Sequence, residues 1–282
     1  MSAEITVVKL GGELLEDAAA IRRAAGALVK LAARRSLVVV HGGGRAVDAE
    51  LRLRGQAARF VDGLRVTDDA ALEAAVSVLA GRNNTALVAA INADGGRAVG
   101  LTGADAGIGL CERARDFTSV AGDRVDLGLV GHPVGQNTVL LEDLLAHGYV
   151  PVIASIGVDA DGALLNVNAD TLAGHLAAAL HACELIVAGT TPGVLNGDGE
   201  PIAELDVDSV DEMTASGAAH SGMVAKLAAC RHAVLAGVDR VAIVDGGAAG
   251  GFAGAPGTRI VSRANDVVRR LGAGFESGEL RV

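Results

Sequence analysis

The sequence predicts an α/β protein in which helices cover a mostly parallel central sheet. Short Val- and Ile-rich runs alternate with longer Ala-, Leu- and Arg-rich segments of helical period, the pattern of parallel strands joined by crossover helices. Half of the 282 residues are hydrophobic, which is enough for a large core in one domain or two lobes. Glycine-rich turns follow several of the strand-like runs, where the chain must turn into a helix.

The first half of the chain opens with a βαβ unit. Residues 5–10 are predicted to form a buried strand, 17–34 an amphipathic helix and 37–40 a second buried strand. The same patterns predict helices at 45–54 and 69–93 and a strand at 98–101. Residues 111–131 carry charges among short β-prone pieces, which predicts hairpins at the edge of a lobe.

A second α/β half follows after a lobe boundary that we place near residues 165–185. The elements predicted from 139 onwards are helices at 139–147, 170–181 and 223–236, strands at 150–155, 164–168, 185–188 and 240–244, and a turn at 159–162. A glycine-rich loop is expected at 246–257. The tail at 261–282 is expected either to extend a last helix or to fray.

The charge balance limits the kinds of partner. Acidic residues outnumber Lys and Arg by 34 to 24, which gives a net charge of -10 at pH 7. Such an excess argues against nucleic-acid binding and against adhesion to an anionic membrane. Any anionic ligand must therefore be held by a local site.

Cysteine usage and the absence of export signals favour a cytoplasmic protein. Cys111, Cys183 and Cys230 lie far apart, without a CxxC pair, so a disulfide framework or a zinc site is disfavoured. The first residues lead straight into a strand, without the features of a signal peptide. The longest apolar stretches are interrupted before the roughly 20 residues that a bilayer span needs, so no membrane segment is expected.

Two lysines far apart in the chain each lie beside glycine. Lys9 closes the first strand and precedes Gly11 and Gly12, whereas Lys226 follows Gly222 in a helical run. A fold that joins them would place two cations and bare backbone amides at one cleft, which suits phosphate. The triplet at residues 42–44 ends another strand at the start of a helix, where backbone N–H groups and the helix dipole favour an anion.

Other nucleotide and catalytic motifs do not occur. The chain has neither GxxxxGK[ST] nor a GxGxxG unit with its acidic partner, and no GxSxG elbow. The histidines form no set with metal-ligand spacing, and His41 is expected to pack or hydrogen-bond at its turn. Arg65 is a candidate for bidentate binding of a carboxylate. Asn168 is a candidate helix N-cap, which leaves Asn166 and Asp170 as candidate functional residues.

Taken together, these motifs resemble the amino-acid kinase family and, within it, the N-acetyl-L-glutamate kinases. In chain order they are KLGGE at Lys9, HGGG at His41, DGLRVTD at Asp62, NVNAD at Asn166, SGMVAK at Ser221 and GTRI at Gly257. The KxGG and GMxxK elements are shared with carbamate kinase and aspartokinase. The combination of DGLRVTD and NVNAD narrows the resemblance to the N-acetyl-L-glutamate kinases. The resemblance covers nearly the whole chain and implies an open α/β/α sandwich. It places amino-acid binding and dimerisation in an N-terminal lobe (1–175) and ATP binding in a C-terminal lobe (176–282).

The resemblance also implies a role for each matching residue. Lys9 and Lys226 would stabilise the transferring phosphoryl group, and Asp170 would align the two lysines. The residues expected to bind N-acetyl-L-glutamate are Gly43, Gly44, Arg65 and Asn166, the last two at its α-carboxylate. Those expected to contact ATP or phosphate are Lys9, Gly11, Gly12, Gly44, Thr190, Thr191, Gly193, Val194, Leu195, Ala218, Ala219, His220, Met223 and Lys226. Mg²⁺ would arrive with the nucleotide, with no dedicated protein metal site.

The implied activity is ATP-dependent phosphorylation of the γ-carboxylate of N-acetyl-L-glutamate, an early step of arginine biosynthesis. Two departures from the family pattern leave alternatives open: Thr190 replaces a usual Asp in the nucleotide-lobe loop, and Asn83 and Asn84 replace a usual Asn–Lys pair. One alternative is a kinase of N-succinylglutamate or another acylated acidic amino acid. The alternative from a different class is a non-catalytic amino-acid sensor with the same fold.

The resemblance also bears on assembly. The family's arginine-inhibited hexamers carry an extra helix before the KxGG strand, and here only eight residues precede Lys9. This comparison predicts a homodimer without feedback inhibition by arginine.

Overall fold

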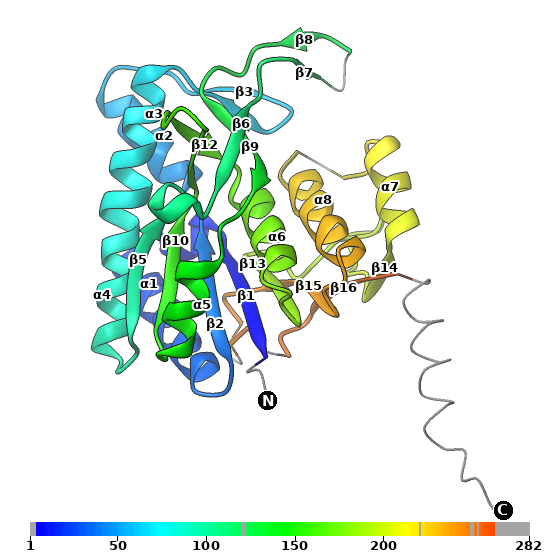
Figure 1. Cartoon of the computed structure of the whole chain (residues 1–282). Helices are drawn as coiled ribbons and strands as arrows, with labels where there is room; N and C mark the ends of the chain where they lie inside the picture. The colour runs from blue at the N-terminus through cyan, green and yellow to red at the C-terminus, as the bar shows by residue number, and fades with distance from the viewer. Residues whose placement is uncertain (1–3, 120–121, 220, 249–250, 253, 263–282) are drawn as a thin grey trace, which may run out of the picture.

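The computed structural model describes residues 4–119, 122–219, 221–248, 251–252 and 254–262, and it confirms the predicted fold class. One eight-stranded sheet lies between layers of helices, as Figure 1 shows. The strands of this sheet are β1 (Ile5–Leu10), β2 (Ser36–His41), β5 (Ala98–Thr102), β10 (Val150–Ala154), β13 (Glu184–Gly189), β14 (Glu204–Asp206), β15 (Arg240–Asp245) and β16 (Gly257–Val261).

The sheet order is β14-β16-β15-β13-β1-β2-β10-β5. Neighbouring strands are parallel from β15 through to β5, and the β14–β16 pair runs antiparallel to them. The central strands β1, β2, β10 and β13 are buried along almost their whole length, because helices cover both faces. The first strand lies between one strand from each half of the chain, so the sheet continues across the predicted lobe boundary.

Helices form the two outer layers. The α-helices among the described residues are α1 (Ala18–Ala32), α2 (Gly44–Leu53), α3 (Asp69–Val76), α4 (Asn84–Ala93), α5 (Val139–Ala146), α6 (Ala169–Ala179), α7 (Val207–Ala215) and α8 (Ser221–Leu235). Helices α1 and α4 pack on one face of the sheet through a core that includes Leu28 and Ile91. On the opposite face, α5, α6 and α8 share a core that includes Leu141, Leu172 and Leu227.

Smaller β elements stand above one end of the sheet (Figure 1). Four strands close into a small barrel: β6 (Leu110–Arg113), β9 (Val130–Gly135), β11 (Ile156–Val158) and β12 (Leu164–Val167). Two hairpins accompany it: β3 (Arg59–Val61) with β4 (Leu64–Val66), and β7 (Phe117–Thr118) with β8 (Arg124–Val125). The hairpin predicted within 111–131 is therefore present.

The helix predicted at 69–93 is one continuous helical stretch with a π-helical segment, Ser77–Asn83, between α3 and α4. Among the described helices, this stretch alone is long and apolar enough to pass a length-and-composition test for a membrane span. A core helix passes the same test, and here 44% of the most apolar window is buried inside the protein. The buried amide of Asn84 fits that position, since it donates to the Val152 carbonyl at 2.9 Å.

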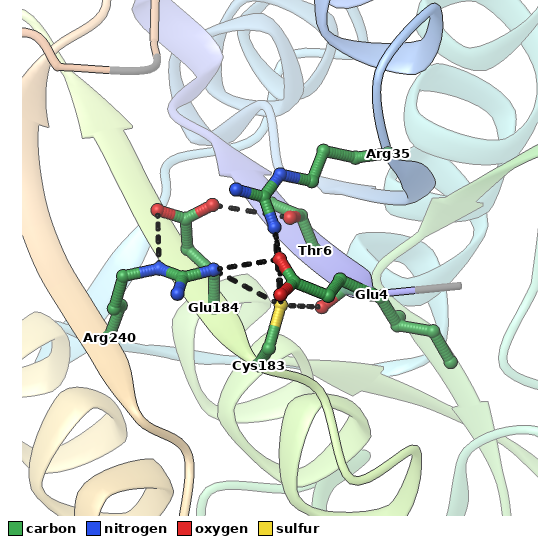
Figure 2. Close-up of polar contacts among 7 residues, drawn as sticks. Glu4, Thr6, Arg35, Cys183, Glu184 and Arg240 are labelled. Carbon is green, nitrogen blue, oxygen red and sulfur yellow. Dashed lines mark hydrogen bonds and ion pairs between the residues drawn. The ribbon is translucent and has the colours of Figure 1, made fainter. Parts of the chain in front are cut away.

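Charged side chains hold together the amino-terminal ends of four strands, opposite the ends that carry the glycine turns (Figure 2). Glu4 forms an ion pair with Arg35, and Arg240 contacts Glu184 with 3.5 Å between Nε and Oε1. Arg240 also donates to the Cys183 sulfur at 3.3 Å. Arg240 Nη2 lies 3.4 Å from Glu4 Oε2. The start of β1 is thereby tied to the starts of β2, β13 and β15.

Described elements without a counterpart in the sequence prediction include the strands β3, β4, β11, β14 and β16 and the helix α7. Strand β14 ends the sheet and β16 lies next to it, and the only fully buried side chain of α7 is Val210. Their apolar periodicity is therefore weak. Of the predicted tail, Val261 ends β16, and residues 263–282 lie outside the described part of the chain.

Candidate active site

A buried ion pair joins the end of the first strand to the start of a helix. Lys9 lies near the carboxyl end of β1, and Asp170 lies in the first turn of α6. Their Nζ and Oδ1 atoms are 2.9 Å apart, and both residues are only 5–6% exposed. Asn168 caps α6, as predicted, because its side-chain oxygen accepts from the N–H groups of Asp170 and Thr171. The cap fixes the direction in which the helix begins and therefore where the carboxylate stands.

Two glycine turns meet backbone to backbone beside this pair. A Cβ on Gly12 would lie 2.7 Å from the Cα of Gly43, so neither turn tolerates a side chain at the contact. Gly43 occupies the N-cap position of α2 without a side-chain cap, which leaves the first N–H groups of that helix open. Gly43 and Gly44 line the space next to Lys9.

Arg65 is buried on β4 rather than solvated. Its guanidinium contacts Asp48 at 2.6 Å, donates to the Gly44 carbonyl at 3.1 Å and stacks over the Phe60 ring at 4.7 Å. Asn166, on β12, donates to the Thr67 hydroxyl at 3.1 Å. Both side chains are therefore held by neighbours that fix their direction.

One cavity brings these residues together. It has a volume of about 240 Å³ and is lined by Lys9, Gly12, Glu13, Gly42, Gly43, Gly44, Val47, Phe60, Gly63, Leu64, Arg65, Leu79, Val130, Ser155, Asn166, Val167, Asn168, Ala169 and Asp170. All four residues predicted to bind the amino acid are in this set, together with Lys9 and Asp170. The cavity lies at the carboxyl ends of the parallel strands, where open α/β sheets bind ligands.

Lys226 is not among the cavity-lining residues. It is half-buried on α8, and its Nζ donates to the Gly222 carbonyl at a long 3.4 Å. Its Cε lies 3.8 Å from the point that a Cβ on Gly189 would occupy, at the carboxyl end of β13. The side chain therefore reaches the same edge of the sheet as Lys9, while the described part of the chain contains no Lys226–Asp170 ion pair.

The buried Cys230 thiol lies within electrostatic range of Asp170, Lys9 and Lys226. Burial is the main cause that raises the pKa of the Cys230 thiol, and the Asp170 carboxylate raises it further. Lys9 and Lys226 both act in the opposite direction. One buried group thus lies within electrostatic range of all three.

The predicted nucleotide residues fall into two segments. Thr190 and Thr191 are exposed directly after β13. Gly193 and Val194 are buried, and the Val194 N–H donates to the Thr258 hydroxyl at 2.7 Å, which ties this loop to β16. Leu195 is exposed at a bridge to Pro201.

The second nucleotide segment precedes and begins α8. Ala218 is exposed, Ala219 is buried and Met223 is half-buried, whereas His220 lies outside the described residues. No group of three or more His, Cys, Asp or Glu side chains that could hold a metal ion occurs among the described residues.

Sequence reasoning missed several residues at this site. Glu13, Asp48 and Phe60 line the cavity or hold Arg65. Glu13 is the last residue of the KLGGE motif, but the motif assigns it no role. The other two are brought to the site by α2 and the β3–β4 hairpin. No local pattern in the sequence marks them.

His41 is a structural residue of the glycine turn, as expected. Its Nδ1 lies 3.1 Å from the Gly42 carbonyl, and its Nε2 lies 3.1 Å from the side-chain nitrogen of Asn84. Burial lowers the pKa of His41 to about 4. The neutral ring, donating from Nδ1 and accepting at Nε2, satisfies both partners.

Comparison with known proteins settles the family. Residues 4–245 match the model of the amino acid kinase family. This chain belongs to the amino acid kinase family. Within it, the chain is 43% identical to an acetylglutamate kinase of Solidesulfovibrio magneticus over 213 residues, which cover 74% of this chain and 71% of the relative. It is 40% identical to that of Methylobacterium nodulans over 248 residues, 86% of this chain and 82% of the relative.

Solved structures of lower identity share the fold of this amino acid kinase. The N-acetylglutamate synthase of Neisseria gonorrhoeae has a TM-score of 0.79 at 22% identity, covering 92% of this chain and 60% of that one. A Giardia carbamate kinase has a TM-score of 0.68 at 15% identity, covering 93% and 100%. The family and the acetylglutamate kinase resemblance inferred from the motifs are therefore confirmed.

Proposed function

We propose that this protein transfers the γ-phosphoryl group of ATP to the γ-carboxylate of N-acetyl-L-glutamate, forming N-acetyl-L-glutamyl 5-phosphate, an early step of arginine biosynthesis. The observation that carries this proposal is that the Lys9–Asp170 pair opens into the same cavity as Arg65 and Asn166. A cation for phosphate and side chains for a carboxylate thus share one small space. The similarity of this chain to acetylglutamate kinases points to N-acetyl-L-glutamate as the acceptor.

The cavity suits a small free amino acid. Pockets for drug-sized ligands measure roughly 300 to 1,000 Å³, and this one is smaller, at about 240 Å³. In the proposal, Arg65 and Asn166 hold the α-carboxylate, while Gly43 and Gly44 present backbone N–H groups. Arg65 keeps donors free after its contacts with Asp48 and Gly44, because a guanidinium has five N–H groups.

The reaction needs no general base. A γ-carboxyl group has a reference pKa of about 4.3 and is ionised at neutral pH, so the acceptor is already a nucleophile. The site must bring two anions together and neutralise charge on the equatorial oxygens of the transferred group. In the proposal Lys9, Lys226 and the N–H groups of Gly12 and Gly44 do this, and Asp170 orients Lys9. The N–H of Gly11, which the motif resemblance also implied, is taken up by the Ala188 carbonyl at 2.8 Å.

ATP is proposed to bind along residues 190–195 and the start of α8. Both segments stand at the carboxyl edge of the sheet, next to the cavity. Mg²⁺ is proposed to arrive bound to the phosphates, where it supplies further positive charge. Asp170 and Glu13 are the carboxylates that line the cavity.

The proposed division of labour follows the two lobes. Every lining residue of the cavity lies within residues 1–175, the proposed amino-acid lobe, and the proposed nucleotide segments lie within 176–282.

We also propose a cytoplasmic homodimer. Strand β5 ends the sheet, so in the described part of the chain its outer edge is available to a second copy. Light scattering after size exclusion measures this state.

A coupled ADP-release assay with a panel of acceptors tests the function. We expect N-acetyl-L-glutamate to be phosphorylated far better than N-succinylglutamate, aspartate or carbamate. Preference for N-succinylglutamate would move the assignment to that acceptor, and inactivity with all four would favour the sensor alternative. Millimolar arginine in the same assay tests the expected lack of feedback inhibition.

A further inference from the structure

The two lysines of the site differ in their partners. Lys9 has a carboxylate of its own in Asp170. Among the described residues Lys226 has no ion pair, and its ammonium is held only by the Gly222 carbonyl at 3.4 Å. That distance lies beyond the usual range of an N–H···O hydrogen bond, so the ammonium is weakly held.

Glu13 is a carboxylate that lacks a cationic partner among the described residues. It follows the Gly11–Gly12 turn, in a short 3₁₀ helix (Gly12–Leu15), and lines the cavity. Its carboxylate forms no ion pair within the described part of the chain. An unpaired carboxylate beside the proposed phosphate position would repel the phosphate, so a cation is needed there.

The position of the Glu13 carboxylate is set by two glycines. A Cβ on Gly11 would lie 2.6 Å from the Glu13 Cδ, which means that the carboxylate fills the space a side chain there would take. A Cβ on Gly189 would lie 3.1 Å from Glu13 Oε1. The carboxylate is therefore inserted between the carboxyl ends of the neighbouring strands β1 and β13.

Lys226 reaches the same point from α8. Its Cε lies 3.8 Å from that same Cβ position on Gly189. Rotation about the last bonds of the side chain would move Nζ from the Gly222 carbonyl towards Glu13 without any movement of α8. A charged acceptor binds an ammonium more strongly than a backbone carbonyl does.

We propose that Glu13 is the positioning residue for Lys226, as Asp170 is for Lys9. Each lysine then has a carboxylate from a neighbouring element, and Glu13 keeps the Lys226 ammonium at the junction of β1 and β13, facing the cavity. The catalytic part of this inference rests on the proposed function, whereas the pairing itself does not. Gly189 has to lack a side chain for the two groups to meet.

Chemical labelling tests the pairing without any assay of activity. The chain has three lysines, so acylation by acetic anhydride can be followed at each one by peptide mass spectrometry. In Glu13→Gln we expect the labelling rate of Lys226 at pH 8 to rise about threefold or more, since an amine without its carboxylate partner is less firmly held and more open to the reagent. Lys30, exposed on α1, is the internal reference. Glu16→Gln, which removes an exposed carboxylate paired with Arg45, is the matched control and should leave Lys226 unchanged.

Kinetics and nucleotide binding test what the pairing does. In Glu13→Gln we expect kcat to fall at least tenfold, with the KM for the amino acid unchanged. The same substitution in a Lys226→Ala background should lower kcat little further, because the two residues act as a unit.

Two results would overturn the inference. One is an unchanged Lys226 labelling rate in Glu13→Gln. The other is an equal loss of kcat from Glu13→Gln in both backgrounds, together with weaker binding of MgATP but not of metal-free ATP, which would make Glu13 a magnesium ligand. An inactive wild-type enzyme with accelerated Lys226 labelling in Glu13→Gln would reject the proposed function and leave the pairing standing.

Discussion

Lys9 and Asp170 form an ion pair from which water is almost excluded, with 2.9 Å between nitrogen and oxygen. Removing one partner of such a pair leaves a buried charge uncompensated. We expect Asp170→Ala to lower the free energy of unfolding by about 3 to 5 kcal/mol. Urea denaturation of the wild type and the variant measures this.

A paired substitution separates stability from activity at the same position. Lys9→Met combined with Asp170→Leu removes both charges at similar volume and should recover most of the lost stability. We expect that double variant to be folded and without kinase activity. Near-normal turnover would show that neither charge takes part in the reaction.

Lys226 should affect the rate and not the fold. Its side chain is half-buried and its ammonium has one weak contact, so Lys226→Ala should unfold at the wild-type urea concentration. Loss of one donor to the transferring group typically costs about 3 to 4 kcal/mol, or roughly a hundredfold to a thousandfold in kcat. Steady-state kinetics checks this, and a change of less than tenfold would remove Lys226 from the mechanism.

A substitution of Arg65 should weaken binding of the acceptor and leave binding of the nucleotide unchanged. Arg65→Lys keeps the charge but loses the planar fork that contacts Asp48 and Gly44. We expect the KM for N-acetyl-L-glutamate to rise by about tenfold or more, as for a lost charge-assisted bond of roughly 1.5 to 3 kcal/mol, while the KM for ATP is unchanged. An equal rise in both KM values would argue for a general disturbance of the site.

Gly174 allows α6 and α8 to approach closely, and this contact sets the position of Lys226. A Cβ on Gly174 would lie 2.8 Å from the Ala229 carbonyl oxygen, so Gly174→Ala must push the helices apart. Overpacking of this kind costs about 1 to 3 kcal/mol. We expect lower stability and a lower kcat with little change in the KM for the amino acid. Gly81→Ala, at a position with open space around it, is the control.

His41 should make stability depend on pH. Its pKa is about 4 in the folded protein and about 6.5 when exposed, so between these values the unfolded chain binds the extra proton. The contribution of neutral His41 is complete above pH 6.5 and is lost as the pH falls towards 4. From pH 7.5 to pH 5 the loss should be about 2 kcal/mol. The variant His41→Asn retains a side-chain N–H donor but does not titrate in this range, so its urea unfolding should lack this pH-dependent loss of stability. The same pH dependence in the variant and the wild type would contradict the assignment to His41.

The sequence predicts most of the sheet because parallel strands buried on both faces leave continuous apolar runs. The strands at 5–10, 37–40, 150–155 and 185–188 were found in this way. The strand β14 and the helix α7 were not found, because a short edge strand and a largely exposed helix bury too little to leave a periodic signal.

At the candidate site, the motifs identify residues and the fold supplies their neighbours. Lys9, Arg65, Asn166 and Asp170 come from four separate segments, and the structure places all four at one cavity. The burial of the Arg65 side chain was not predictable, because it depends on Phe60 across the β3–β4 hairpin and on Asp48 from α2. The partner of Lys226 likewise depends on two glycines whose spacing only the packed strands determine.

The central claim is that Lys9 and Lys226 converge on one transferring phosphoryl group, and a crystal structure with MgADP, aluminium fluoride and N-acetyl-L-glutamate tests it most directly. The account predicts that both Nζ atoms lie within about 3 Å of the fluoride ligands, on opposite sides of the planar group. A structure in which Lys226 remains at the Gly222 carbonyl while Lys9 alone contacts the fluoride would contradict it.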